Sequence, residues 1–265
     1  MNLLILGHEG YLGSYLYENI KNKYNVDTLK VDSDVYYNGK KYDYVINCAA
    51  ISDLEYCEEN KEESDYVNRD IINDIIKYYS ESKIIHFSSY YVYDDEGFCN
   101  ENSKTTRKYN YCRQKLESEE IVTKNNSVSF RLGKLFGHEY LNKNERDRLP
   151  EHIIKNDNLR LDDVKFNPTR LNQVLRVVEY ELKNNNLFGI YNLSNNGYST
   201  HYEFACYINE ILGNKKHIEI SSKTKRIFHN YDKCLMDCSK LDKIIKLVDW
   251  RKDMDEYLEN LKILV

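Results

Sequence analysis

The chain has 265 residues, a formal net charge of −5 at pH 7 and a pI of about 5.9. Its 38 basic residues are scattered among 43 acidic ones, so no basic face for nucleic acid is evident. No stretch approaches the roughly 18 consecutive apolar residues of a membrane span, so we expect neither nucleic acid nor a membrane as a partner. This length suits one large α/β domain or a nucleotide-binding domain with a smaller lobe.

The N-terminus runs directly into an apolar segment without a basic region, which predicts a first strand at residues 3–6 and not a signal peptide. The seven cysteines are odd in number and lie mostly inside expected elements. They fit reduced thiols in the cytoplasm better than a disulfide framework. Cys234 and Cys238 lack the spacing and the nearby partners of a zinc site, so we expect no metal.

A glycine-rich turn, Gly7, Gly10 and Gly13, follows this strand and opens a helix expected at residues 11–24. Glycine permits the tight turn and lets the backbone approach a pyrophosphate at the positive end of the helix. The strand-turn-helix setting favours a dinucleotide site over a plain turn. We therefore expect Tyr11 and Leu12, together with the three glycines, to bind the cofactor.

Asp32 ends a second strand expected at residues 28–31, roughly 20 residues after Gly13, where an acid that binds the adenosine ribose is expected. A carboxylate there repels a 2′-phosphate, so NAD(H) is favoured over NADP(H). Asp34 competes for this role, and Lys30 keeps NADP(H) possible.

Buried strands are also expected at residues 44–47, 84–88 and 128–132, with helical periodicity at 66–80 and 111–122. This alternation predicts an α/β fold with a doubly wound parallel sheet, that is, a Rossmann domain.

The polar, aperiodic residues 138–148 mark the entry to a second lobe. Later expected elements are a helix at 169–183, a strand at 189–193 and helices at 201–212 and 252–263. We expect an NAD(P)-binding Rossmann domain at residues 1–137 and a smaller substrate-binding lobe at 138–265. Parts of the lobe, at about 169–193, are expected to pack back on the Rossmann domain.

Ser88 and Ser89 end the strand at residues 84–88, where groups at the carboxyl edge of a parallel sheet face a ligand crevice. Tyr111 and Lys115, one helical turn apart, can point into the same crevice. The Tyr-x-x-x-Lys spacing recurs in this tyrosine-rich chain, and only Tyr111 follows an apolar run that ends in hydroxyls. The other pairs are Tyr17/Lys21, Tyr36/Lys40, Tyr37/Lys41 and Tyr79/Lys83.

The Ser89, Tyr111 and Lys115 set predicts carbonyl or alcohol chemistry with a nicotinamide cofactor. An ammonium close to a phenol favours the phenolate and lowers the pKa of the phenol from about 10 toward neutrality. Lys115 would act on Tyr111 in this way, Tyr111 would transfer the proton, and Ser89 would orient the substrate oxygen.

Several segments in order resemble the extended short-chain dehydrogenase/reductase family, and most closely the dTDP-4-dehydrorhamnose reductase group. They are residues 7–13, 45–50, 66–68, 86–93, Tyr111 with Lys115, 130–137 and 167–169.

The resemblance implies NAD(P)H-dependent reduction of the 4-keto group of a nucleotide-activated 4-keto-6-deoxy sugar, held between the Rossmann domain and the smaller lobe. It places Ala49 and Ala50 along the cofactor, makes Asn68 a support of the crevice, and gives Lys115 and Tyr111 cofactor contacts. The substrate-binding residues expected are Ser88, Ser89, Tyr90 and Tyr111.

Tyr90 departs from this group, which often has Asp there, so the orientation of the substrate stays open. Residues 89–91 also lack the Asp-Glu pair of sugar dehydratases, which argues against dehydration. An epimerase that retains NAD and a non-catalytic dinucleotide-binding regulatory subunit are the alternatives. A homodimer is possible, and cations to test for diphosphate contact are Arg131, Arg148, Arg160 and Lys165.

Overall fold

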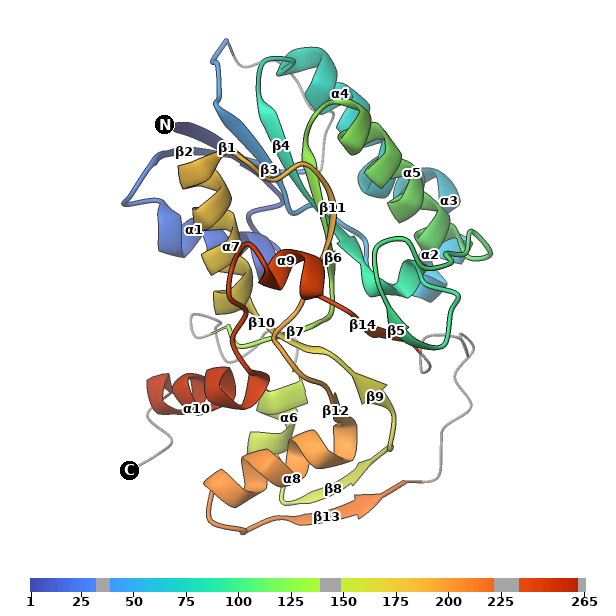
Figure 1. Ribbon diagram of the computed structural model, residues 1–265, viewed down its shortest axis with the longest axis vertical. Coiled ribbons are helices and arrows are strands. Elements are labelled where there is room, and N and C mark those ends of the chain that lie inside the picture. Colours follow the sequence, from blue (N-terminus) through green and yellow to red (C-terminus); the bar gives the residue numbers. More distant parts are fainter. Residues whose placement is uncertain (32–38, 139–148, 222–233, 262–265) are drawn as a thin grey trace. The chain divides into compact units, whose positions relative to one another are not determined.

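The computed structural model describes residues 1–31, 39–138, 149–221 and 234–261, which form two compact units (Figure 1). Unit 1 consists of Met1–Tyr93, Lys104–Leu132 and Leu175–Asn192. Unit 2 consists of Asp94–Ser103, Gly133–Val174 and Leu193–Val265. The roles expected for residues 1–137 and 138–265, cofactor binding and substrate binding, stay predictions.

Unit 1 is built on a six-stranded sheet with the order β11-β6-β4-β3-β1-β2. The strands are β1 Asn2–Leu6, β2 Asn25–Leu29, β3 Tyr44–Asn47, β4 Lys83–Ser89, β6 Val128–Leu132 and β11 Gly189–Leu193. The first five pair in parallel. The central strands are buried along almost their whole length, as parallel strands covered on both faces must be. The expected α/β Rossmann-like fold is confirmed.

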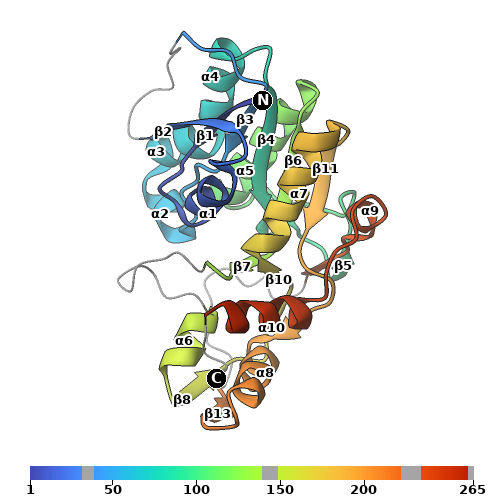
Figure 2. The same cartoon turned by 90° about the vertical axis from the view of Figure 1, so that its left-hand side faces the viewer.

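Helices cover both faces of this sheet (Figure 1, Figure 2). They are α1 Tyr11–Ile20, α2 Leu54–Glu59, α3 Lys61–Asp65, α4 Ile71–Tyr78, α5 Asn110–Lys124 and α7 Leu171–Asn184, with a π-helical turn η1 at Tyr66–Asp70 and a 3₁₀ turn η2 at Tyr90–Val92. The helix expected at residues 66–80 is therefore interrupted by η1 over its first five residues.

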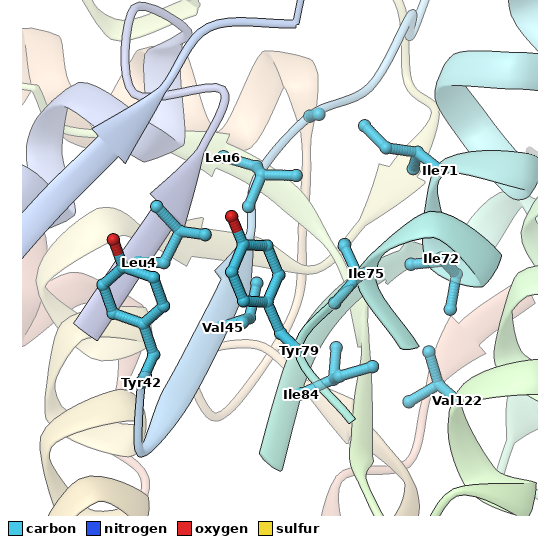
Figure 3. Packing of buried hydrophobic residues seen from close by; sticks show 11 residues of the cluster. Leu4, Leu6, Tyr42, Val45, Ile71, Ile72, Ile75, Tyr79, Ile84 and Val122 are labelled. Atoms are coloured by element: carbon cyan, nitrogen blue, oxygen red, sulfur yellow. The ribbon is translucent and has the colours of Figure 1, made fainter. Parts of the chain in front are cut away.

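The face covered by α4 holds one apolar core cluster (Figure 3). Ile71, Ile72 and Ile75 are spaced so that they lie on one side of α4. They pack against Leu4, Val45 and other side chains of the sheet, and all are buried. Fully burying one such aliphatic side chain stabilises the fold by about 1.5–3 kcal/mol.

The opposite face of β3 contacts α7. Tyr44 precedes Val45, so its side chain points to the other side of the sheet, where its hydroxyl lies 3.2 Å from the Glu181 carboxylate. Lys83 Nζ lies 2.6 Å from the same Glu181 oxygen, and the two side chains are 10% and 0% exposed. Glu181 also accepts from the backbone N–H of Leu187. A buried ion pair therefore joins β4 to α7.

The described residues of unit 2 form paired short strands and four helices. The pairs are β5 Gly97–Cys99 with β14 Cys234–Met236, β7 Lys134–Phe136 with β10 Pro168–Arg170, β8 Asn158–Leu161 with β13 His217–Ile220, and β9 Lys165–Phe166 with β12 Ser199–Thr200. The helices are α6 Leu149–Lys155, α8 His201–Ile211, α9 Ser239–Asp242 and α10 Trp250–Asn260. They enclose a core that includes Phe136, Phe204 and Trp250.

Cys99 and Cys234 form a disulfide between β5 and β14, with their Cα atoms 6.1 Å apart. The expectation of reduced thiols is therefore wrong for this pair. The two cysteines are separated by 135 residues, and the sequence contains no signal that these two short strands pair.

The long elements agree with the expected ones to within a few residues, and β3, β6 and β11 agree at both ends. The strands of unit 2 have two to four residues each, too few to produce a recognisable alternation. Within the described ranges, no helix has the length and apolar character needed to cross a membrane.

The buried pair between Lys83 and Glu181 leads to a test of stability. Lys83→Met leaves the Glu181 carboxylate buried without its cation, and we expect it to lower the free energy of unfolding by about 3 kcal/mol. The control is Lys41→Met, because the side chains of Lys41 and its partner Glu81 are 77% and 72% exposed, and losing so exposed a pair should leave the free energy of unfolding almost unchanged. Urea unfolding measures both, and equal effects would contradict the prediction.

Candidate functional site

The order of the sheet reverses beside β1, which lies between β2 and β3. Gly7 follows the carboxyl end of β1, and Cys48, which follows β3, donates from its backbone N–H to Leu6 O. In open parallel sheets, ligands bind outside the carboxyl ends of the strands at such a switch point. The glycine-rich turn and the residues after β3 are therefore side by side where a ligand is expected.

The glycine-rich turn is packed backbone against backbone. Gly7 has a φ of +72°, and a Cβ on it would lie 2.7 Å from the backbone nitrogen of Ala49. A Cβ on Gly13 would lie 2.1 Å from Gly7 O. Both positions exclude a side chain, the second because the turn folds directly onto the helix that follows.

Gly10 is the N-cap of α1, and no side chain caps this helix or places an acid in its first turn. Its terminal N–H groups and positive dipole end are therefore available to an anion. Leu12 and Ala49 are buried and Tyr11 is half-buried, whereas Ala50 is exposed. The structure thus brings the expected cofactor residues other than Asp32 to one edge of the sheet.

Asp32, Asp34 and most of the loop at residues 138–148 lie outside the described residues, so the structure does not test the cofactor preference. Lys30, which kept NADP(H) possible, lies 3.4 Å from the Glu9 carboxylate.

A buried hydrogen-bond chain leads from Ala49, after β3, to α5. Asn47 Oδ1 accepts from Ala49 N at 3.1 Å, and Asn47 Nδ2 lies 3.3 Å from His86 Nδ1. His86 Nε2 lies 2.9 Å from Ser118 Oγ, which donates to the carbonyl of Lys115 at 2.8 Å. Every partner is satisfied only if His86 is neutral, with its proton on Nε2. Burial, and then the charge of Lys115, lower the pKa of His86 well below its usual range.

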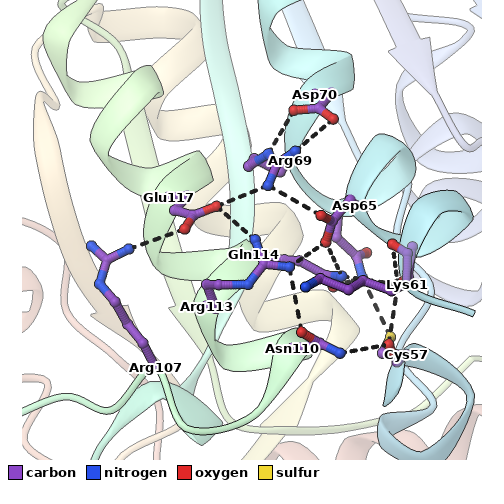
Figure 4. A network of polar contacts seen from close by, with 12 residues as sticks. Cys57, Lys61, Asp65, Arg69, Asp70, Arg107, Asn110, Arg113, Gln114 and Glu117 are labelled. Carbon is purple, nitrogen blue, oxygen red and sulfur yellow. Dashed lines mark hydrogen bonds and ion pairs between the residues drawn. The ribbon is translucent and has the colours of Figure 1, made fainter. Parts of the chain in front are cut away.

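Asn68 supports the same edge from η1. It is 1% exposed, and its side chain accepts from Ile51 N and donates to Ile51 O. It also donates to Gln114 Oε1 at 2.8 Å, which ties the chain after β3 to α5. Gln114 in turn donates to Asp65, part of a wider polar network that joins α5 to α3 and η1 (Figure 4).

Ser89, Tyr111 and Lys115 are brought together at the carboxyl end of β4. All three are buried, and a hydrogen bond from Ser89 acts to lower the pKa of the Tyr111 phenol. Lys115 Nζ lies 5.9 Å from the centre of the Tyr111 ring and donates to Phe87 O at 3.0 Å. The Tyr/Lys pair chosen from its position in the sequence therefore lies beside Ser89 in the structure.

The expected lowering of the Tyr111 pKa is wrong for this structure. Burial raises the pKa of Tyr111, and the hydrogen bond from Ser89 opposes this only in part. Burial also lowers the pKa of Lys115 to about 8, although Glu119 works against that change. The reason is desolvation, which disfavours phenolate and ammonium alike.

The other expected substrate residues flank this group. Ser88 is 4% exposed, and its buried Oγ has no hydrogen-bond partner among the described residues. Tyr90 is half-buried and its ring centre lies 4.5 Å from that of Tyr91. Tyr91 was not expected in the site, yet its charge affects the pKa of Tyr111. Tyr91 could have been predicted as a site residue from the sequence, because it stands two residues after Ser89.

Three of the four cations proposed for diphosphate contact have other partners in the described part of the chain. Arg131 is buried and paired with Glu119, so that interpretation is wrong for Arg131. Arg160 is 80% exposed and paired with Glu219. Lys165 lies over the Tyr198 ring, and Arg148 lies outside the described residues.

Comparison with known families decides the assignment, because the model of the RmlD substrate binding domain matches residues 1–263. The chain belongs to the RmlD family. This is the family of the dTDP-4-dehydrorhamnose reductases, which are extended short-chain dehydrogenases/reductases and NAD(P)-dependent oxidoreductases, so the resemblance seen in the sequence is confirmed.

A curated relative of this RmlD family member is a probable low-salt glycan biosynthesis reductase from Haloferax volcanii, 38% identical over 84 residues. That match spans 30% of this chain and 28% of the relative.

Among solved structures, a dTDP-4-dehydrorhamnose reductase from Clostridium acetobutylicum is 22% identical, with 99% of this chain and 100% of that chain covered and a TM-score of 0.79. One from Bacillus anthracis, in complex with NADP, is 17% identical over 97% and 98% of the two chains, with a TM-score of 0.80. MoeE5 in complex with UDP-glucuronic acid and NAD is 14% identical over 99% of each chain, with a TM-score of 0.77. These likenesses support the fold.

The packing of the glycine-rich turn in this RmlD family member can be tested by substitution. Gly13→Ala places a methyl group against Gly7 O, so we expect it to lower the free energy of unfolding by about 3 kcal/mol. Gly10→Ala is the control, since its nearest contact would be 3.3 Å away and it should cost under about 1 kcal/mol. Urea unfolding of both variants decides, and a mild effect of Gly13→Ala would refute the close packing.

The neutral state of His86 predicts a pH dependence of stability. Because its folded pKa is below the unfolded value of about 6.5, the unfolded chain takes up the proton first as the pH falls. The stabilisation is complete above pH 6.5 and is lost below it, by up to about 1.4 kcal/mol per pH unit.

Urea unfolding at pH 7.5, 6.5 and 5.5 should show this loss in the wild type, and a smaller one in His86→Gln. The control is His217→Gln, whose exposed ring pairs with Glu219; it should keep the slope of the wild type. Parallel slopes for wild type and His86→Gln would show that His86 is not held neutral.

Proposed function

We propose that this protein reduces the 4-keto group of a nucleotide-activated 4-keto-6-deoxy sugar, using a hydride from NADH or NADPH and a proton from Tyr111. The observation that carries the proposal is the buried group of Ser89, Tyr111 and Lys115 at the carboxyl end of β4. The family membership supports the reaction class, and the sugar and its nucleotide follow from the resemblance alone.

Tyr111 is the proton donor in this proposal. Because burial raises its pKa, the phenol keeps its proton at neutral pH and gives it up only to a strong base, such as the alkoxide formed when hydride reaches the carbonyl carbon. The electron pair of the C=O bond then becomes the new O–H bond.

Ser89 and Lys115 prepare the donor. Ser89 Oγ accepts from Tyr91 N at 3.2 Å, which fixes the hydroxyl so that it can donate to the substrate oxygen or to Tyr111. Lys115 brings a positive charge to the phenol, which stabilises the negative charge left there after proton transfer. Ser88 and Tyr90 are proposed to line the substrate beside Ser89.

The cofactor would be held by the turn at residues 7–13, by Ala49 and Ala50, and by Lys115. The fit is supported by the side-chain-free cradle at Gly7 and Gly13 and by the uncapped start of α1. A bound reduced nicotinamide supplies the hydride. We propose a preference for NAD(H) because of Asp32, with NADP(H) as the alternative.

The proposal is tested by following the absorbance of reduced nicotinamide while the protein is mixed with 4-keto-6-deoxy nucleotide sugars, with NADH and NADPH in separate assays. Tyr111→Phe should lower kcat by about 10²- to 10⁴-fold. Tyr109→Phe, which removes a hydroxyl two residues earlier, is the matched control and should keep most of the activity.

Equal activity of wild type and Tyr111→Phe would contradict the role of Tyr111. Bound cofactor without its consumption would favour the other two functions. Conversion of a sugar to its epimer would then identify an epimerase, and no conversion would favour a regulatory subunit.

A further inference from the structure

A buried ion pair lies behind the proposed catalytic residues. Glu119 on α5 is 1% exposed and Arg131 on β6 is 3% exposed. Arg131 Nε donates to Glu119 Oε1 at 2.9 Å and Nη2 donates to Oε2 at 2.7 Å. Such a two-pronged contact fixes the orientation of both groups and offsets much of the cost of burying their charges.

The pair connects the pieces of backbone that carry Ser89 and Lys115. Arg131 is the register partner of Ser88 in the pairing of β4 with β6. Its guanidinium lies 4.9 Å from the centre of the Tyr93 ring and is hydrogen-bonded to that side chain. The Tyr93 hydroxyl donates to Asn192 of β11 at 2.6 Å. Tyr93 ends the segment that begins at Ser89, so both ends of that segment are tied to the sheet.

Glu119 also stands one helical turn after Lys115, on the same side of α5. Four other titratable groups interact with the charge of Lys115. They are Tyr111 on α5, Cys57 on α2, His86 on β4 and Cys48. Burial raises the pKa of both thiols and of Tyr111 and lowers that of His86, so these groups are neutral at pH 7. Glu119 supplies the carboxylate.

We propose that Glu119 and Arg131 are positioning residues of the proposed reductase: Glu119 keeps Lys115 in its ammonium form, and Arg131 fixes the Glu119 carboxylate and residues 89–93. This inference rests on the proposed function. The arrangement needs both members. A buried carboxylate beside Lys115 without Arg131 would carry the full cost of desolvation, whereas the two hydrogen bonds from the guanidinium offset much of that cost and hold the carboxylate in place.

The experiment is the pH profile of kcat/KM for nicotinamide oxidation in the wild type and in Glu119→Gln. Removing the carboxylate makes the ammonium of Lys115 less stable, so we expect the alkaline limb, near pH 8 in the wild type, to move down by about one pH unit. Glu119→Asp keeps the charge and should restore most of the profile. The matched control is Glu120→Gln, the next residue on α5, whose exposed carboxylate pairs with Arg107; its limb should not move.

A uniform loss of kcat/KM in Glu119→Gln, with the limb unmoved, would reduce the pair to a structural role and overturn the proposal. If Glu119→Gln does not fold, Glu119→Gln/Arg131→Gln removes both charges and keeps an amide contact, and an unmoved limb in this variant likewise overturns it. If the wild type consumes no reduced cofactor, the proposed function fails. The affinity for NADH, measured by its fluorescence at a series of pH values, then tests the inference, because Lys115 is a proposed cofactor contact. The alkaline limb of this affinity profile must move down by the same amount in Glu119→Gln, and an unmoved limb overturns the inference.

Discussion

The enclosure of the Lys115 ammonium in the protein is the constraint on which the arrangement of the site depends. Its Nζ has the Phe87 carbonyl as a hydrogen-bond partner, and at 1% exposure it has almost no contact with water. An ammonium so placed loses hydration and with it part of its hold on the proton. The residues around it therefore have to be neutral or negative, and the neutral tautomer of His86 on β4 and the carboxylate of Glu119 on α5 meet this condition.

The same requirement links the two halves of the site. The hydrogen bonds of His86 lead to Asn47 and so to Ala49, whose backbone nitrogen is the atom that excludes a side chain from Gly7. The backbone beside the glycine-rich turn and the helix that carries Tyr111 and Lys115 are thus connected through buried polar contacts and not only by the sheet. In a low-dielectric interior such contacts have to be satisfied completely, which limits how far either half can move without the other.

Sequence reasoning found the parts of the site that depend on local order along the chain. Gly7, Ser89, Tyr111 and Lys115 follow from strand ends and helical spacing, and the parallel sheet follows from long apolar runs. The partners of charged side chains could not be found in this way. Arg131 is a plausible phosphate ligand by residue type, and only the register of β6 beside β4 turns it toward Glu119. The short strands of unit 2 and the Cys99–Cys234 disulfide depend likewise on pairing between distant segments, which the sequence does not record locally.

The direction of the pKa shifts bears on the direction of the chemistry. Burial raises the pKa of Tyr111 and lowers that of Lys115 to about 8. At neutral pH the site without ligands therefore holds a protonated phenol beside an ammonium whose pKa is only slightly above the pH. Such a site holds a proton to give and no phenolate to accept one, which is the state that the proposed carbonyl reduction requires. Alcohol oxidation would require a phenolate, which this desolvated pocket disfavours unless a further positive charge arrives. In the proposed function a bound oxidised nicotinamide would carry that charge, so the charge of the cofactor itself would bias the same residues toward reduction or oxidation.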